Sequence, residues 1–112
     1  MSRRILSALA LSATLLLAAC ESSEERAEEF YEAGMELLAE GDLDRAIVSF
    51  RNVFRFDGEH YEARKELADA LIETGNTSEG YSQYLRLAEQ YPDDALVRQR
   101  LPYLALLAQA WS

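Results

Sequence analysis

The chain has 112 residues, enough for one small domain at most, and its formal charge is −9. Two of its eleven basic residues, Arg3 and Arg4, precede Cys20 and all twenty acidic residues follow it, so the part from Cys20 onward carries −11. This excess of acid argues against a nucleic-acid partner, because phosphate contacts require clustered Lys and Arg.

The first 19 residues have the layout of a secretory signal peptide. Ser2-Arg3-Arg4 gives a positive start, and residues 5–19 form an uncharged, mostly apolar run that ends in small residues. The run has 15 residues, whereas a membrane-spanning helix needs about 20. We therefore predict a signal peptide over residues 1–19.

Cys20 is the only cysteine, which excludes an intrachain disulfide. The segment Leu17-Ala18-Ala19-Cys20 resembles the lipobox of bacterial lipoproteins. The resemblance implies that the chain is cut before Cys20 and that its sulfur carries a diacylglyceryl lipid, which anchors the protein to a membrane. We expect no cofactor beyond this lipid and no metal. Glu21 follows the cysteine where Asp would favour the inner membrane, so we expect the periplasmic face of the outer membrane. The alternative is an ordinary signal peptide with an incidental Cys20.

After an acidic linker over residues 20–26, the sequence is rich in Leu, Ala, Glu and Arg, which favour helix. Apolar residues at three- and four-residue steps predict helices near 23–40, 43–56, 60–74 and 77–90. Ser22 with Glu25 predicts a capping box, and the other end signals are glycines at helix C-termini and polar N-caps, namely Gly41, Gly75, Asp42 and Asn76-Thr77. The fold class is therefore all-α.

The chain repeats itself with a period of 34 residues. On that shift Gly34 meets Ala68 and Phe50 meets Tyr84, and further matches join Glu28 to Glu62, Leu37-Leu38 to Leu71-Ile72, and Gly41-Asp42 to Gly75-Asn76. Small residues let two helices approach closely, and the aromatic residues fill the space between them. This pattern resembles the tetratricopeptide repeat, a helix–turn–helix unit of 34 residues.

The resemblance implies a short right-handed solenoid of helical hairpins. Its units would be a first repeat over 27–60, a second over 61–94 and the first helix of a third over 95–112. Three residues depart from the family pattern, with Gly58 in place of proline, Arg64 in place of a bulky aromatic residue and Gly80 in place of alanine. The alternative is an ordinary antiparallel helical bundle with a chance period.

The last segment, residues 95–112, is apolar nearly all round. We expect one face to pack on the helix over 77–90 and the other to lack a partner in the chain. Pro102 should kink this helix or start it anew, because its ring blocks a helical hydrogen bond. Two hypotheses follow, namely self-association or docking through residues 95–112, and a chain that is a truncated member of a longer repeat protein.

In this family the first helix of each pair lines a concave groove that binds peptides or proteins. The resemblance assigns to such a groove Tyr31, Met35 and Leu38 from the first unit, and Lys65, Asp69 and Ile72 from the second. Some members hold a peptide carboxylate with a Lys and Asn clamp, but here Asp69 stands where the Asn is wanted, so we predict no such clamp. An apolar or basic extended segment would suit this surface. At any one position, a plain core or solvated role is the alternative.

Nothing in the sequence supports catalysis, because a Ser-His-Asp set, a phosphate-binding Gly loop and metal-ligand spacing are all missing. His60 is expected to be an exposed turn histidine. The leading hypothesis is a membrane-anchored periplasmic scaffold that binds a protein or peptide in cell-envelope assembly or export. One alternative is a peptidoglycan- or glycan-associated binding lipoprotein, whose candidate aromatics are Tyr61, Tyr81 and Tyr91. The other is a truncated fragment without independent function.

Overall fold

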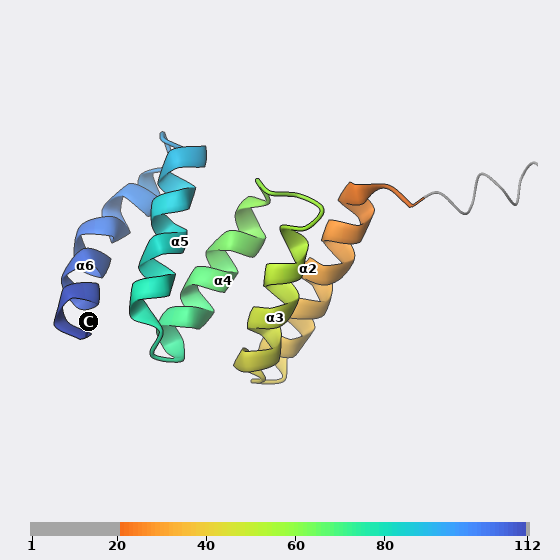
Figure 1. Ribbon diagram of the computed structural model, residues 1–112, viewed down its shortest axis with the longest axis horizontal. Coiled ribbons are helices and arrows are strands. Elements are labelled where there is room, and N and C mark those ends of the chain that lie inside the picture. Colours follow the sequence, from red (N-terminus) through yellow and green to blue (C-terminus); the bar gives the residue numbers. More distant parts are fainter. Residues whose placement is uncertain (1–20, 112) are drawn as a thin grey trace, which may run out of the picture.

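The computed structural model describes residues 21–111, which form five helices in a row (Figure 1). These are α2 (Ser23–Ala39), α3 (Leu43–Val53), α4 (Tyr61–Glu73), α5 (Thr77–Gln90) and α6 (Ala95–Trp111). Helix α2 pairs with α3 and α4 with α5, while α3 packs on α4 and α5 on α6. No strand occurs in this part of the chain. The prediction of an all-α solenoid of helical hairpins is confirmed. The leader over 1–19 and Cys20 lie outside the described residues.

Both hairpin turns follow from their glycines. Gly41 and Gly75 have φ values of 79° and 89°, the left-handed region that side chains disfavour. In the first turn the amide of Asp42 donates to the carbonyl of Leu37 at 2.9 Å and that of Gly41 donates to Leu38 at 3.0 Å. These two bonds form a Schellman motif, which satisfies the last carbonyls of α2. The second turn repeats the same pair of bonds at Gly75 and Asn76.

The N-caps were predicted with mixed success. Ser22 Oγ accepts the amide hydrogen of Glu25 at 3.2 Å, and Asp42 Oδ1 accepts that of Arg45 at 3.2 Å. Asn76 occupies the N-cap position of α5 without a side-chain cap bond, and its amide nitrogen donates to Thr74 Oγ1 at 3.2 Å. The expected cap at Asn76 is therefore wrong in its side-chain contact, although its position is correct.

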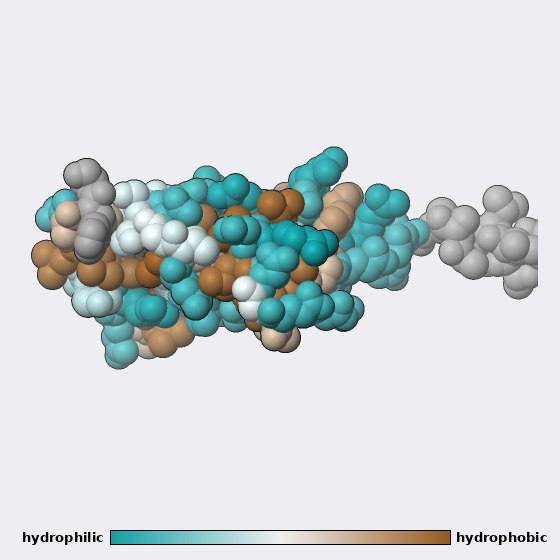
Figure 2. Space-filling model, turned by 90° about the horizontal axis from the view of Figure 1, so that it is seen from below, coloured by the Kyte–Doolittle hydropathy of each residue, from teal (hydrophilic) through white to brown (hydrophobic). Residues whose placement is uncertain are grey.

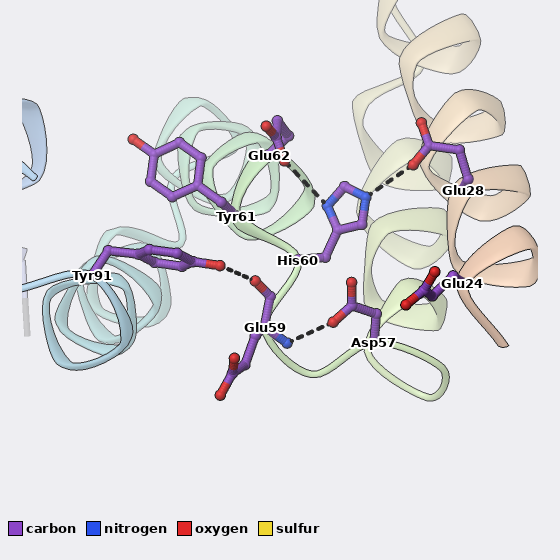
Figure 3. A pocket seen from close by; sticks show the side chains of 8 residues that line it. All are labelled: Glu24, Glu28, Asp57, Glu59, His60, Tyr61, Glu62 and Tyr91. Atoms are coloured by element: carbon purple, nitrogen blue, oxygen red, sulfur yellow. Dashed lines mark hydrogen bonds and ion pairs between the residues drawn. The ribbon is translucent and has the colours of Figure 1, made fainter.

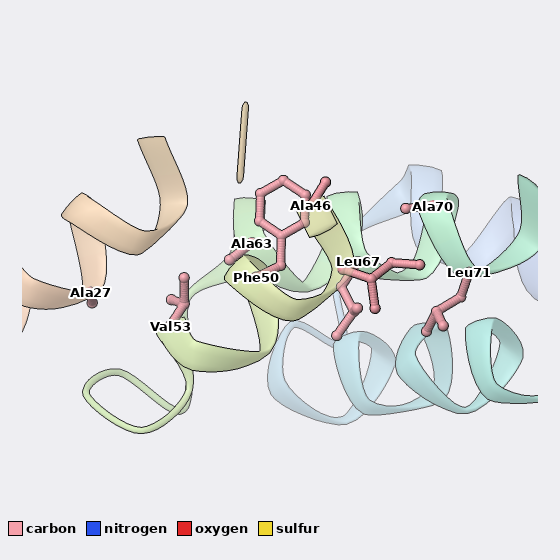
Figure 4. Close-up of a cluster of buried hydrophobic side chains, with 9 residues drawn as sticks. Ala27, Ala46, Phe50, Val53, Ala63, Leu67, Ala70 and Leu71 are labelled. Carbon is pink, nitrogen blue, oxygen red and sulfur yellow. The ribbon is translucent and has the colours of Figure 1, made fainter. Parts of the chain in front are cut away.

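The predicted small–aromatic pairs form the core. Phe50 and Tyr84 are both fully buried. One cluster surrounds Phe50 between α2, α3 and α4 (Figure 4), and a second surrounds Tyr84 between α4, α5 and α6. A Cβ atom added to Gly34 would lie 2.5 Å from Cε1 of Phe50, so only glycine allows this approach of α2 to α3.

Two predicted boundaries are corrected. The second helix was expected to reach residue 56 but ends at Val53, and Phe56 turns back to stack on Phe30 with ring centroids 5.8 Å apart. The first helix was expected near 23–40 and runs over Ser23–Ala39, so the acidic linker that was expected over 20–26 is helical from residue 23. In both places local hydrogen bonds decided the boundary.

Arg64, which departs from the family pattern, is accommodated by neighbouring groups. It is 8% exposed, and its guanidinium lies 4.0 Å from the ring centroid of Phe54. Nη1 donates to Gln83 of α5 at 2.6 Å and Nη2 to the carbonyl of Gly58 at 3.0 Å. The planar cation thus fills the space of an aromatic side chain and joins α4 to α5.

Helix α6 runs through Pro102 without starting anew, contrary to one of the two expectations. One face packs on α5 as predicted, with Val97 and Leu104 fully buried. Leu96, Tyr103 and Leu106 are 47%, 62% and 67% exposed. In Figure 2, apolar side chains extend from the end of the molecule that carries α6 to its middle, whereas hydrophilic ones cover the end with α2.

Candidate functional site

The first helices of the three units, α2, α4 and α6, lie next to one another along one side of the solenoid. Glu28 of α2 contacts His60 at the start of α4, and Asp69 of α4 contacts Arg100 of α6. The 34-residue shift therefore aligns four rows of side chains across these helices: Glu28, Glu62 and Leu96; Tyr31, Lys65 and Gln99; Met35, Asp69 and Tyr103; and Leu38, Ile72 and Leu106. We call this surface the first-helix face.

The predicted groove residues of the first unit are only partly open. The Tyr31 ring lies 6.1 Å from Phe50 and 5.0 Å from His60, so it supports the core as well as the surface. Burial raises the pKa of Tyr31, and nearby glutamates raise it further. Leu38 packs against the cluster around Phe50. Met35 is 37% exposed and is the most accessible of the three predicted residues.

The predicted groove residues of the second unit are engaged within the protein. Lys65 Nζ donates to Asp69 Oδ2 at 3.2 Å. Asp69 Oδ1 accepts from the Tyr84 hydroxyl and from Arg100 Nη1, the latter at 3.1 Å. Ile72 packs in the cluster around Tyr84. The Asp69 carboxylate therefore accepts three hydrogen bonds at once, and these bonds hold α4, α5 and α6 together.

Two members of this network, Tyr84 and Arg100, were not predicted as polar participants. Burial, followed by the hydrogen bond to Asp69, raises the pKa of the Tyr84 hydroxyl. Arg100 donates to that hydroxyl at 3.0 Å, and its guanidinium carbon lies 5.2 Å from the ring centroid. The available signal was the change from Phe50 in the first unit to Tyr84 in the second, which adds one hydroxyl at a buried position.

His60 is not the exposed turn histidine that we expected, since its side chain is 10% exposed. Nδ1 accepts the amide hydrogen of Ala63 at 3.1 Å and so caps α4. In the neutral ring the proton then lies on Nε2, 3.2 Å from Glu28 Oε2 of α2. His60 therefore joins the first unit to the second.

A cavity of about 520 Å³ opens beside His60, between the N-terminal ends of α2 and α4 (Figure 3). Its walls contain five acidic residues, one histidine and two tyrosines, with no lysine or arginine: Glu24, Glu28, Asp57, Glu59, Glu62, His60, Tyr61 and Tyr91. Such a wall attracts cationic groups. Among the described residues, no group of three or more His, Cys, Asp or Glu side chains could hold a metal ion.

The two tyrosines of this cavity pack on each other. Tyr61 and Tyr91 meet edge to face with centroids 5.1 Å apart, and the Tyr91 hydroxyl donates to the carbonyl of Glu59. Burial raises the pKa of Tyr61 to about 12, with a further rise from its hydrogen bond to Asp94. The pair braces the loops at this edge and does not form the row of parallel rings that a sugar-binding platform would use.

Comparison with known proteins agrees with the helical repeat. None of the helices that the structure describes is long and apolar enough to cross a membrane. A family model described as Tetratricopeptide repeat matches residues 37–110, well over half of the chain. No curated protein matches the sequence. Repeats of this kind serve as protein-interaction scaffolds and not as enzymes. The chain belongs to the tetratricopeptide repeat family.

Proposed function

We propose that this protein is a lipid-anchored scaffold of the bacterial cell envelope that captures a segment of another protein on its first-helix face. The anchor is the lipid on Cys20, and the location is the periplasmic side of the outer membrane. The support is the signal-peptide layout, the lipobox-like Leu17-Ala18-Ala19-Cys20 and the absence of Asp after the cysteine. The partner would act in envelope assembly or export.

The chemistry of the face indicates the kind of segment. Its acidic cavity contains no basic side chain among the lining residues, and it is the observation that carries the proposal. Met35 is exposed on α2 about two helical turns beyond Glu28 of the cavity wall, and a flexible thioether adapts to varied apolar groups. We therefore expect a partner segment that combines basic residues with apolar ones. Long-range attraction should speed its capture and make binding sensitive to salt.

The binding proposal is tested by site-specific photo-crosslinking in membranes. A photoreactive residue replaces Met35 on the first-helix face, and the matched control replaces Val48, which is 58% exposed on α3. We expect a protein adduct at position 35 only, and less adduct when Glu24 and Glu59 are both changed to Gln. Equal adducts at both positions, or recovery of glycan without protein, would contradict the proposal.

The anchor is tested separately by Cys20→Ser. The acidic part of the chain has no basic patch to hold it on anionic lipid, so this variant should leave the membrane fraction and lose incorporation of labelled palmitate. Density-gradient separation of the two membranes tests the outer-membrane location of the unaltered protein. If Cys20→Ser still sediments with membranes and resists salt extraction, the lipid-anchor proposal is wrong.

A further inference from the structure

Helix α6 repeats the position of α4, but within residues 21–111 no helix lies over it as α5 lies over α4. The 34-residue shift places Arg98, Pro102 and Leu106 where α4 has Arg64, Ala68 and Ile72. We call these three residues of α6 the end face. In α4 the first two are 8% and 0% exposed, because α5 lies over them. On α6 all three end-face residues are exposed, Leu106 at 67%.

The α4–α5 contact shows what such a face accepts. A Cβ atom on Gly80 of α5 would lie 2.9 Å from the carbonyl oxygen of Ala68 and 2.6 Å from Cγ1 of Ile72, so the covering helix needs a small residue at that point. Three residues later, Gln83 accepts a hydrogen bond from Arg64 at 2.6 Å. One residue further, Tyr84 packs against Ala68 in the core.

Both covering helices share this pattern. Helix α3 carries Ala46, Ser49 and Phe50 at the spacing of Gly80, Gln83 and Tyr84. A helix that covers a first helix in this protein therefore has a small residue, a polar residue three positions later and an aromatic residue after it.

Charge indicates which kind of helix fits the end face. The only charged residues of α6 are Arg98 and Arg100, and Arg100 is engaged by Asp69. Docking of two α6 helices would bring their Arg98 side chains to one interface without an acidic residue from either helix. A second copy of α6 is thus a poor occupant, whereas a helix with an acceptor opposite Arg98 is a good one.

We propose that the end face of α6 docks an amphipathic helix of a partner protein with this small, polar, aromatic pattern, and that an acidic or amide side chain of that helix accepts a hydrogen bond from Arg98. The contact continues the α4–α5 interface across the end of the solenoid. Leu106 also belongs to the first-helix face, but the cavity that carries the proposed function lies between α2 and α4 and has no lining residue from α6, so the tests at Met35 and at Leu106 can succeed or fail independently.

The test uses the full chain in detergent and a stapled synthetic helix with the sequence of residues 76–91 as the probe. Binding is followed by fluorescence anisotropy, and circular dichroism verifies that each variant is folded. We expect saturable binding that Leu106→Asp weakens at least about tenfold, the size expected for losing one buried leucine contact. Val48→Asp introduces the same charge at another exposed apolar side chain, on α3, and should leave binding unchanged.

Two exchanges test the pattern itself. A probe with Leu at the Gly80 position should not bind. Arg98→Glu should lose the original probe and regain binding with a probe that carries Arg at the Gln83 position. Absence of saturable binding, or equal binding to Leu106→Asp, overturns the proposal. If the unaltered chain sediments as a dimer that Leu106→Asp dissociates, the occupant is a second copy and the partner helix is excluded.

Discussion

Gly34→Ala tests the close approach of α2 to α3 that shapes the first-helix face. The added Cβ would lie 2.5, 2.7 and 2.8 Å from three carbons of the Phe50 ring, which is fully buried. Overpacking of this kind costs about 1–3 kcal/mol. Removing a glycine from a helix interior returns about 1 kcal/mol. We therefore expect a net loss of about 1 kcal/mol, which lowers the melting temperature of a domain this size by about 4–8 °C.

The assay is urea unfolding followed by circular dichroism. The midpoint should fall while the slope stays unchanged, since the exposed area hardly differs. Gly58→Ala is the matched control, because nothing lies within 4 Å of its added Cβ and its φ is not positive. That variant should be neutral or gain about 0.4–1 kcal/mol through the unfolded state. If Gly34→Ala is as stable as Gly58→Ala, the helices can separate freely and the packing argument is refuted.

Three further predictions concern buried and capping groups. Tyr84→Phe should cost about 1.5–3 kcal/mol in the same urea assay, which is the worth of a hydrogen bond to a charged acceptor. Burial raises the pKa of Tyr84 above its ordinary 10.0. Stability should therefore fall as pH rises past that value, where the unfolded chain ionises first, and the variant should show a flatter alkaline limb. Asp94 accepts the amide hydrogen of Val97 at 3.0 Å, and this bond lowers the pKa of Asp94 below 3.8. The contribution of Asp94 to stability is therefore present above that pH and disappears as pH falls through the lowered pKa. The melting temperature of Asp94→Asn should be less sensitive to acid. Gly75→Ala forces a side chain into a φ of 89° and should cost about 1–2 kcal/mol, and a melting curve unchanged by it would contradict the turn geometry.

The hairpins could be predicted because their signals are local and repeated. Small residues, aromatic residues and turn glycines recur at one spacing, and each acts through backbone geometry that sequence position fixes. The end of α3 could not be predicted in the same way. Phe54 and Phe56 continue the apolar pattern, yet the amides of residues 54–56 bond to carbonyls three residues back and tighten the chain into turns. Burial of Phe56 against Phe30 is a tertiary contact that no local pattern contains.

The internal contacts of the candidate site could not be predicted from the sequence. The resemblance assigned Lys65 and Asp69 to a binding groove, but it could not reveal that both are used internally. Arg100, which donates to Asp69, lies 31 residues beyond it, so this contact depends on how three helices are spaced. For His60, the sequence showed a turn position, whereas its burial comes from Tyr31 and Glu28 on another helix.

The hydroxyl of Tyr84, which the repeat pattern did not predict, makes two parts of the first-helix face differ in chemistry. Tyr84 lets Asp69 bind a donor on α5 and another on α6. The first unit has Phe50 and Met35 at these positions, and neither side chain can take part in such a network. The α4–α6 part is therefore cross-linked by charged hydrogen bonds. The α2–α4 part is joined through His60 and presents an adaptable methionine about two helical turns from the acidic cavity. Since a saturated polar network offers few groups to a ligand, capture of a basic segment should be concentrated on the α2–α4 part, with the α6 end left for a contact that is mainly apolar.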